Sequence, residues 1–328
     1  MSLTLRGLAG ASEETTRTIL QAASDLGYVP DAGARNLARK SSQSIGVLLN
    51  NMHNPFFADV VGGLQARMLE AGFHILMGVG EGLRLERSVL DTFRSYRMEG
   101  AVLIGPEVRE REIEAFGQGV STVVIGRQVR TAAVDVIVGD DRGGATLAVQ
   151  HLYDLGHRDI AHLDGANIPG GGNARRRGYI DAMRRLDLER HVRIAGGGFT
   201  LRHAAEGIDE LVRKRPPTAI FAVNDLVALG AMERLSELGL STPGDVSIVG
   251  YDNTSLAAQR RVGLTSIDQP RVEMGELAAS LLLERFAGRT DASRHVLAPK
   301  LVERDSTATL TSSSKSRGRT ATRKETTP

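Results

Sequence analysis

Polar, charged and aromatic side chains follow the short apolar runs of this sequence, where a buried strand would end. In open parallel sheets, ligands bind beyond the carboxyl ends of the strands. The candidates at these ends are Asn50, Phe56, Phe57, Arg127, Arg175, Phe199, Asn224 and Asp252. Aromatic faces beside guanidinium, amide and carboxylate groups suit a small polyhydroxylated or heterocyclic ligand. Each residue alone is compatible with a turn or cap, the better explanation for Asn54 and Asp225, so the predicted site rests on the set.

Catalytic and cofactor motifs are not found in the sequence. The Gly-rich pieces GGGN and GGGF lack the Lys-Ser/Thr pair of a phosphate loop, and GVGEG lacks the dinucleotide-binding spacing. There is no G-x-S-x-G nucleophile elbow. His151, His157 and His162 do not have the spacing of metal ligands. We therefore predict no catalytic residue, no metal site and no cofactor.

The elements that must position the candidate residues alternate along the chain. Apolar runs such as SIGVLL, GAVLIG, STVVIG and DVSIVGY are separated by helical patterns such as FADVVGGLQARMLEAG. Unbroken apolar strands alternating with helices are typical of parallel sheets covered on both faces. The strands are too many for one small sheet, and a second series begins near Asp159, so we predict two doubly wound α/β lobes. A helix pattern at 271–286 and a strand pattern at 295–305 favour a crossover of the chain between lobes.

The composition is that of a cytoplasmic globular protein. The 328 residues include no cysteine, which excludes disulfides and thiolate metal sites. No apolar run approaches the length of a membrane span, and no signal-peptide layout is present. Residues 311–328 carry five Lys or Arg and one Glu, a charge of +4; since the whole chain carries +2, the remainder carries −2. This Ser/Thr-rich tail is expected to be disordered.

A helix is predicted over residues 12–26, ahead of the first lobe. Ser12 can act as its N-cap, two acidic residues suit the positive end of the helix dipole, and Gly27 stands at the C′ position. Pro30 stops any continuation. The basic stretch that follows, AGARNLARK, runs without a spacer into the first strand and contains an apolar Leu37. On residue types alone, it is a basic linker with one leucine.

Four stretches of the sequence resemble the lactose-repressor (LacI) family of transcriptional regulators. They are SEETTRTILQAASDLGYVPDAGARNLARKSSQSIGVLLNN with the following NPFF, HLYDLGHRDIAHLDG, ARRRGY, and NDLVALGAMERLSELGLSTPGDVSIVGYDN. The resemblance covers residues 4–305. It implies a type I periplasmic-binding-protein-like core fused to a helix-turn-helix DNA reader, in a homodimer or tetramer. It also implies a ligand-responsive repressor that binds operator DNA.

The resemblance assigns effector contacts in the second lobe. Arg175 and Asp252 match a guanidinium and a carboxylate that clamp ligand hydroxyls in the family. Phe199 matches an aromatic position that stacks on the ligand, and Asn224 is a further polar contact. A sugar or sugar acid is therefore the first expectation for the effector. A nucleobase-like ligand stacked on Phe199 is the second.

In the first lobe, the resemblance implies that Phe56 and Phe57 line the cleft with Asn50 nearby. Arg127 falls at a position where family members differ widely. Gly126 replaces an acidic residue of some members, which removes a hydroxyl acceptor. No particular sugar specificity is therefore carried over.

The resemblance also implies contacts with DNA. The segment before the first core strand would become a hinge helix on the minor groove, with Leu37 as the apolar wedge that opens a base step. Ala34 and Ala38 would let two copies approach, and Arg35 would contact phosphate. Arg6 matches a recognition-helix arginine that contacts DNA. The family pattern begins only at TLRGLAG, near the end of the recognition helix, so we expect this chain to bind operator DNA poorly and the full-length protein to bind it.

The predicted organisation has five parts. They are a partial helix-turn-helix headpiece (1–29), a hinge (30–44), an N-terminal core lobe (45–158 with 266–288), a C-terminal core lobe (159–265 with 289–310) and a disordered basic tail (311–328). Ligand bridging the lobes would act on the hinge, and the sequence leaves open whether it releases or retains DNA. A periplasmic solute-binding protein would share the core but need an export signal. An α/β enzyme would need a nucleophile or cofactor loop.

Overall fold

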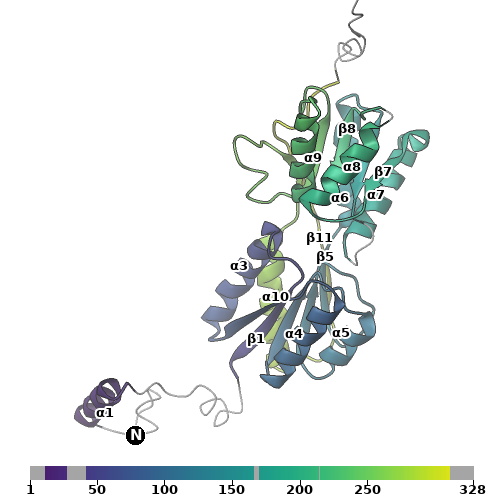
Figure 1. Ribbon diagram of the computed structural model, residues 1–328. Helices are drawn as coiled ribbons and strands as arrows, with labels where there is room; N and C mark the ends of the chain where they lie inside the picture. The colour runs from purple at the N-terminus through teal and green to yellow at the C-terminus, as the bar shows by residue number, and fades with distance from the viewer. Residues whose placement is uncertain (1–11, 28–41, 166–169, 214, 311–328) are drawn as a thin grey trace, which may run out of the picture.

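The computed structural model describes residues 12–27, 42–165, 170–213 and 215–310 of the chain. Within this part, two α/β lobes lie end to end (Figure 1). The predicted DNA contacts Arg6, Ala34, Arg35, Leu37 and Ala38 lie outside the described residues, as do most of the predicted hinge and the basic tail.

Each lobe is built on a six-stranded sheet, in the order β11-β5-β4-β3-β1-β2 for the first lobe and β12-β10-β9-β8-β6-β7 for the second. The first sheet contains β1 (Ser44–Leu49), β2 (His74–Val79), β3 (Gly100–Ile104), β4 (Ser121–Ile125), β5 (Asp135–Gly139) and β11 (Arg294–Leu297). The second contains β6 (Ile160–Asp164), β7 (Arg193–Gly196), β8 (Ala219–Ala222), β9 (Ser247–Asp252), β10 (Thr265–Asp268) and β12 (Lys300–Val302). Every described strand pair is parallel except β10 with β12. The predicted fold class, two doubly wound parallel sheets, is confirmed.

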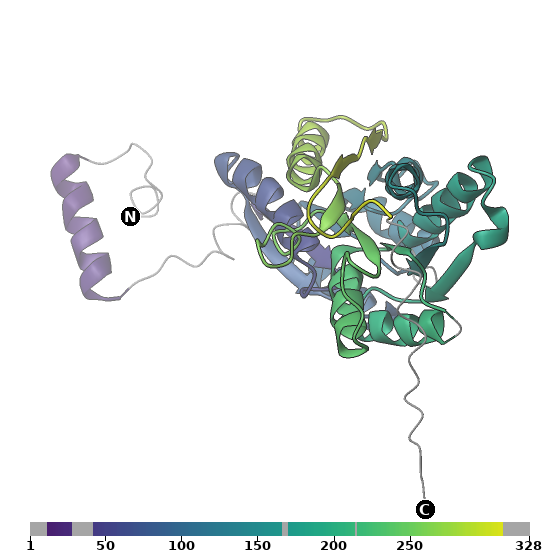
Figure 2. The same cartoon turned by 90° about the horizontal axis from the view of Figure 1, so that it is seen from above.

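Helices cover both faces of each sheet, which explains why the strands are apolar throughout (Figures 1 and 2). In the first lobe, α3 (Pro55–Glu70) and α10 (Arg271–Phe286) cover one face, and α4 (Leu83–Ser95) and α5 (Glu110–Gly117) cover the other. In the second lobe, α8 (Leu201–Val212) and α9 (Asp225–Glu237) lie opposite α6 (Asp141–Asp154) and α7 (Gly172–Arg185). A short 3₁₀ helix, η2 (Glu189–His191), follows α7.

The predicted N-terminal helix is confirmed as α1 (Glu13–Asp25). Its N-cap Ser12 accepts a hydrogen bond from the Thr15 backbone N–H at 3.3 Å. Gly27 has a φ of +60°, the left-handed conformation for which glycine is favoured after a helix. None of the residues of α1 is buried, and Leu26, next to its end, is 82% exposed.

The chain passes between the lobes three times. Strand β5 of the first sheet ends at Gly139, and the next helix, α6, joins the core of the second lobe. Strand β10 of the second sheet ends at Asp268, and α10 then joins the first lobe. Strand β11 follows α10 in the first lobe, and the chain then crosses to β12 in the second sheet. Three short connections therefore carry any change in the angle between the lobes.

These crossings correct the predicted lobe boundaries in three places. Residues 141–158 and 266–268 belong to the second lobe rather than the first, and β11, at 294–297, belongs to the first rather than the second. The local pattern predicts a helix or a strand but not which sheet it joins. That choice depends on pairing with distant strands, such as the parallel pairing of β11 with β5.

Candidate functional site

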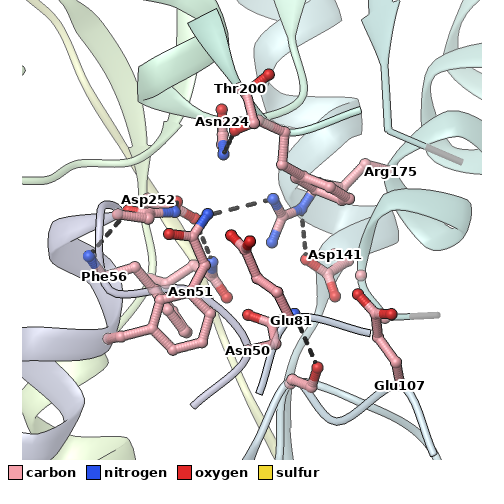
Figure 3. A pocket seen from close by; sticks show the side chains of 18 of the residues that line it. Asn50, Asn51, Phe56, Glu81, Glu107, Asp141, Arg175, Thr200, Asn224 and Asp252 are labelled. Carbon is pink, nitrogen blue, oxygen red and sulfur yellow. Dashed lines mark hydrogen bonds and ion pairs between the residues drawn. The ribbon is translucent and has the colours of Figure 1, made fainter. Parts of the chain in front are cut away.

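A cavity of about 260 Å³ lies between the lobes at the carboxyl ends of the strands (Figure 3). Seven of the eight predicted site residues line it: Asn50, Phe56, Phe57, Arg175, Phe199, Asn224 and Asp252. They are contributed by both lobes and are separated by up to about two hundred positions in the chain. The cavity is thus the place where side chains predicted one by one come together.

Arg175 on α7 is the buried cation of the site. Its Nε donates to Asp141 Oδ1 at 2.8 Å, its Nη1 donates to the Val223 carbonyl at 2.7 Å, and Nη1 lies 3.8 Å from Asp252 Oδ1. The guanidinium also lies over the Tyr251 ring, 3.8 Å from its centroid. Burial opposes the charged form, but Asp141, Tyr251 and Asp252 outweigh it and raise the pKa of Arg175. The guanidinium is therefore charged and held in one orientation.

A close approach of two helices places Arg175 beside Asp141. Gly178 follows Arg175 by one turn of α7, and a Cβ added there would lie 2.5 Å from the backbone oxygen of Arg142 on α6. Glycine is therefore required where α7 meets α6. Asp141 is the first residue of α6, so its carboxylate also lies at the positive end of that helix.

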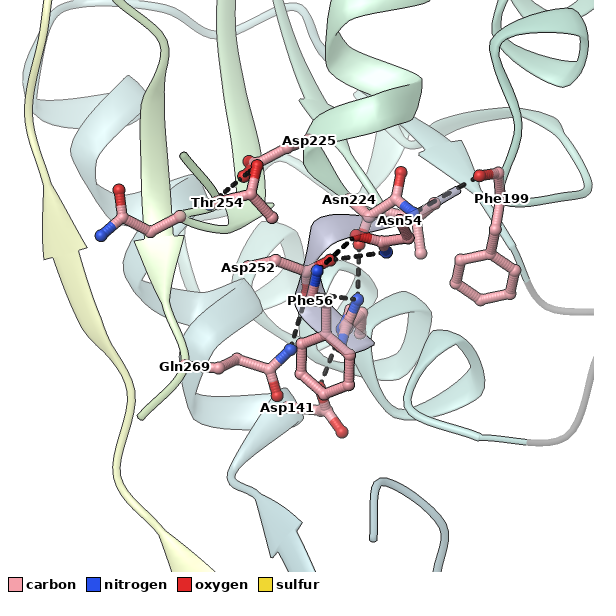
Figure 4. Close-up of polar contacts among 12 residues, drawn as sticks. Asn54, Phe56, Asp141, Phe199, Asn224, Asp225, Asp252, Thr254 and Gln269 are labelled. Carbon is pink, nitrogen blue, oxygen red and sulfur yellow. Dashed lines mark hydrogen bonds and ion pairs between the residues drawn. The ribbon is translucent and has the colours of Figure 1, made fainter. Parts of the chain in front are cut away.

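Asp252 at the end of β9 connects the two lobes across the cavity (Figure 4). Its Oδ1 accepts from Gln269 Nε2 at 2.7 Å, and its Oδ2 accepts from Asn54 Nδ2 of the first lobe at 3.2 Å. Burial raises the pKa of Asp252, although Arg175 works against this rise. Its φ of +102° is unusual for a residue other than glycine, and strained backbone of this kind concentrates at ligand sites.

Asp225 lies behind Asp252 and is 1% exposed. It accepts hydrogen bonds from the Thr254 backbone N–H (2.6 Å), the Thr254 hydroxyl (2.9 Å) and the Ser266 hydroxyl (2.6 Å). Burial and then the charge of Asp252 raise the pKa of Asp225 to about 7. Asp225 is thus an internal brace of the β9–α9 region, consistent with the cap or turn role expected for it.

Aromatic rings form the apolar walls of the cavity. Phe56 and Phe57 meet edge to face, with ring centroids 5.4 Å apart. Phe199 lies against two glycines: a Cβ at Gly165 or Gly172 would come within 2.6 or 2.9 Å of its ring. These glycines fix the ring where it can stack on a bound molecule.

Arg127 is the predicted site residue that the structure places elsewhere. Its Nη1 donates to the backbone carbonyls of Pro106 (2.8 Å) and Val108 (2.5 Å), and its neighbour Gly126 lines the cavity instead. Gly126 has a φ of +76°, and the chain turns there. Arg127 is therefore not among the residues that line the cavity; it braces the loop after β3, and its contact with a ligand stays a prediction.

Replacing Arg127 with methionine should leave ligand affinity within about twofold of the wild type and lower the free energy of unfolding by about 1.5–3 kcal/mol, the range for hydrogen bonds to a charged group. Calorimetry of ligand binding and urea unfolding measure the two quantities. A loss of affinity without a loss of stability would return Arg127 to the site.

Several polar residues of the cavity were not predicted. They are Asn51, Glu81, Glu107, Asp141, Thr200, His203 and Gln269, together with Asn54, for which a turn or cap role is expected. Asn54 does cap α3, by accepting from the Phe56 N–H at 3.0 Å, while its Nδ2 binds Asp252. Glu81, Glu107 and Asp141 follow the ends of β2, β3 and β5. The strand-end rule, applied to these three strands as well, would have found them.

Comparisons with known proteins agree with the fold. A family model described as periplasmic binding protein-like domain matches residues 149–307. The HTH-type transcriptional repressor PurR of Serratia proteamaculans is 31% identical over 304 residues, covering 90% of this chain and 89% of that protein.

Two solved structures extend the comparison. A LacI transcriptional regulator from a Rhodococcus species superposes with a TM-score of 0.76 at 36% identity, covering 81% of this chain and 98% of that one. A LacI family transcriptional regulator from Enterococcus faecium, with bound ribose, has a TM-score of 0.76 at 28% identity, covering 82% and 100% of the two chains. The two-lobed core, the cleft and these likenesses together show that the chain belongs to the LacI family of transcriptional regulators.

Proposed function

We propose that the cleft binds a small polyhydroxylated effector and that its occupancy sets the affinity of this repressor for operator DNA. The hydrogen bond from Asn54 to Asp252 carries the proposal, because it joins the lobes directly through the wall of the cavity. A ligand that takes over this carboxylate must change the contact between the lobes. The ribose bound to the Enterococcus faecium relative supports a sugar-like ligand.

The mechanism follows from the three connections between the lobes. An effector shifts the equilibrium between two lobe arrangements only by its different affinity for each. The first lobe lies next to the predicted hinge in the chain, so it would transmit the change to DNA in the cytoplasm. The DNA contacts proposed for Arg6, Ala34, Arg35, Leu37 and Ala38 rest on the sequence resemblance.

Thermal-shift screening of sugars, sugar acids and nucleosides, followed by calorimetry of each hit, tests the effector part. A true effector should lose most of its affinity in the Asp252→Asn variant, which keeps the shape of the side chain but not its charge. A hit that binds this variant as tightly as the wild type would not occupy the cleft as proposed.

An exposed apolar surface on the first lobe supports a homodimer. The edge strand β2 exposes Leu76, Met77 and Val79, and Leu69 of the neighbouring α3 is 63% exposed. Edge strands with apolar faces are pairing sites unless they are covered. We propose that a second copy of the chain covers this surface.

Replacing Met77, which is 54% exposed, with aspartate should convert the dimer to a monomer without unfolding it. In a symmetric dimer the aspartates of both copies would lie at the interface. Burying their two carboxylates away from water would oppose association. Light scattering after gel filtration measures the mass. Val296→Asp, on the opposite edge of the same sheet and 64% exposed, is the matched control and should stay dimeric. Equal masses for the two variants would contradict this surface.

A further inference from the structure

Three acceptor groups of the first lobe line the cleft and accept no hydrogen bond among the described residues. The carboxylates of Glu81 and Glu107 line the cavity and take part in none of the hydrogen bonds or ion pairs found there (Figure 3). The third is Asn50: its Nδ2 donates to the Gly105 carbonyl at 3.0 Å, while its Oδ1 is buried without a hydrogen-bond partner. This wall is suited to a ligand that donates hydrogen bonds.

The positive charge of the cleft is already matched. The guanidinium of Arg175 lies between Asp141 and Asp252. Arg127 donates to backbone carbonyls and does not line the cavity. Burial lowers the pKa of Arg127, and the charges of Glu110, Glu86 and Glu107 work against this lowering. His203, which lines the cavity, is hydrogen-bonded through Nδ1 to the Thr200 hydroxyl at 2.7 Å. The described wall thus contains four carboxylates and one guanidinium.

We propose that the effector carries a protonated amine on its polyhydroxylated frame and that the amine lies against Glu81 and Glu107. This inference rests on the proposed function and narrows it. An ammonium supplies three donors and a positive charge to a wall that offers acceptors and negative charge. A sugar acid, which the sequence left open, would set its carboxylate against these two groups, and the one guanidinium of the described wall is already paired with Asp141 and Asp252.

Two matched sets of sugars test the proposal by calorimetry on the wild-type protein: glucosamine, glucose and glucuronate, and galactosamine, galactose and galacturonate. In at least one set the amine should bind about tenfold more tightly than the neutral sugar, and the acid more weakly than either, because Glu107 is half-buried while Glu81 is exposed to water. The preference should weaken as salt concentration rises.

Variants assign the preference to the two carboxylates. Glu81→Gln and Glu107→Gln together keep shape and remove both charges, and they should bring the amine and neutral sugars to within about threefold. Glu210→Gln, an exposed carboxylate on α8 outside the cavity, is the matched control and should keep the wild-type preference. The unfolding temperatures of all variants show that each is folded.

Each outcome of these binding experiments either supports or overturns the proposed amine contact. A preference for the amine that the double variant abolishes supports the proposal. Tightest binding of an acid, equal binding of amine and neutral sugar by the wild type, or a preference that the double variant keeps would overturn it and leave the proposed effector cleft standing. Failure of all six sugars would also overturn it. The proposed function is tested separately, by the operator affinity of the protein with and without bound effector.

Discussion

Replacing Arg175 with alanine should lower the free energy of unfolding by about 3–5 kcal/mol, the usual cost of removing one partner from a buried ion pair. Its guanidinium is 8% exposed and satisfies Asp141, the Val223 carbonyl and the charge of Asp252. Without it, two buried carboxylates face each other across an empty volume. Urea unfolding measures the loss.

The same substitution should abolish measurable effector binding, for two reasons. The cavity wall loses the one guanidinium that its described residues contain, and the side chains that Arg175 holds in place are no longer fixed. The matched control is Arg184→Ala on the same helix, where the arginine is 57% exposed and pairs with an exposed Glu189. That pair should contribute less than about 1 kcal/mol. Equal stabilities for the two variants would show that the Arg175 cluster does not hold the site together.

Asp225→Asn should flatten the dependence of stability on pH between about 4 and 7. The folded-state pKa of Asp225 is raised to about 7 from its ordinary 3.8, so the folded protein binds this proton more tightly than the unfolded chain does. Stability from this group is complete below pH about 4 and is lost as pH rises toward 7. The loss should amount to ~2–4 kcal/mol, since one pKa unit corresponds to about 1.4 kcal/mol.

The groups around Asp225 decide the sign of this effect. The carboxylate of Asp252 disfavours the charged form, whereas the hydroxyls of Thr254 and Ser266 and the Thr254 N–H favour it, and burial outweighs them. Urea unfolding at several pH values measures the slope for wild type and variant. Asp209→Asn, at a half-exposed carboxylate on the same lobe, should keep the wild-type slope. A wild-type slope in Asp225→Asn would assign the proton to another group.

The sequence predicted those parts of the site that follow from local pattern and strand ends. Apolar runs alternating with helices indicate parallel sheets, and parallel sheets bring strand ends together. Asn50 could therefore be placed at the carboxyl ends of the first sheet, and Asn224 and Asp252 at those of the second, from the sequence alone. The N-cap of α1 was equally predictable, because Ser12 acts on a residue only three positions away.

The sequence does not predict which way a side chain points or which distant residue it contacts. Arg127 follows a strand as the other candidates do, but the positive φ of Gly126 turns the chain and its long side chain reaches back to Pro106 and Val108. The contact between Asn54 and Asp252 joins residues 198 positions apart, in different lobes. Nothing local to either residue encodes it, and the same holds for the lobe to which β11 belongs.

The measurement that most directly tests the role of the cleft is the operator affinity of the protein, with and without saturating effector, at one salt concentration. Fluorescence anisotropy of labelled operator gives both dissociation constants, and calorimetry shows that the effector is bound. We expect the two constants to differ by about 5- to 150-fold, the usual range of coupling between allosteric sites. Identical constants with the effector bound would contradict a cleft that governs DNA binding.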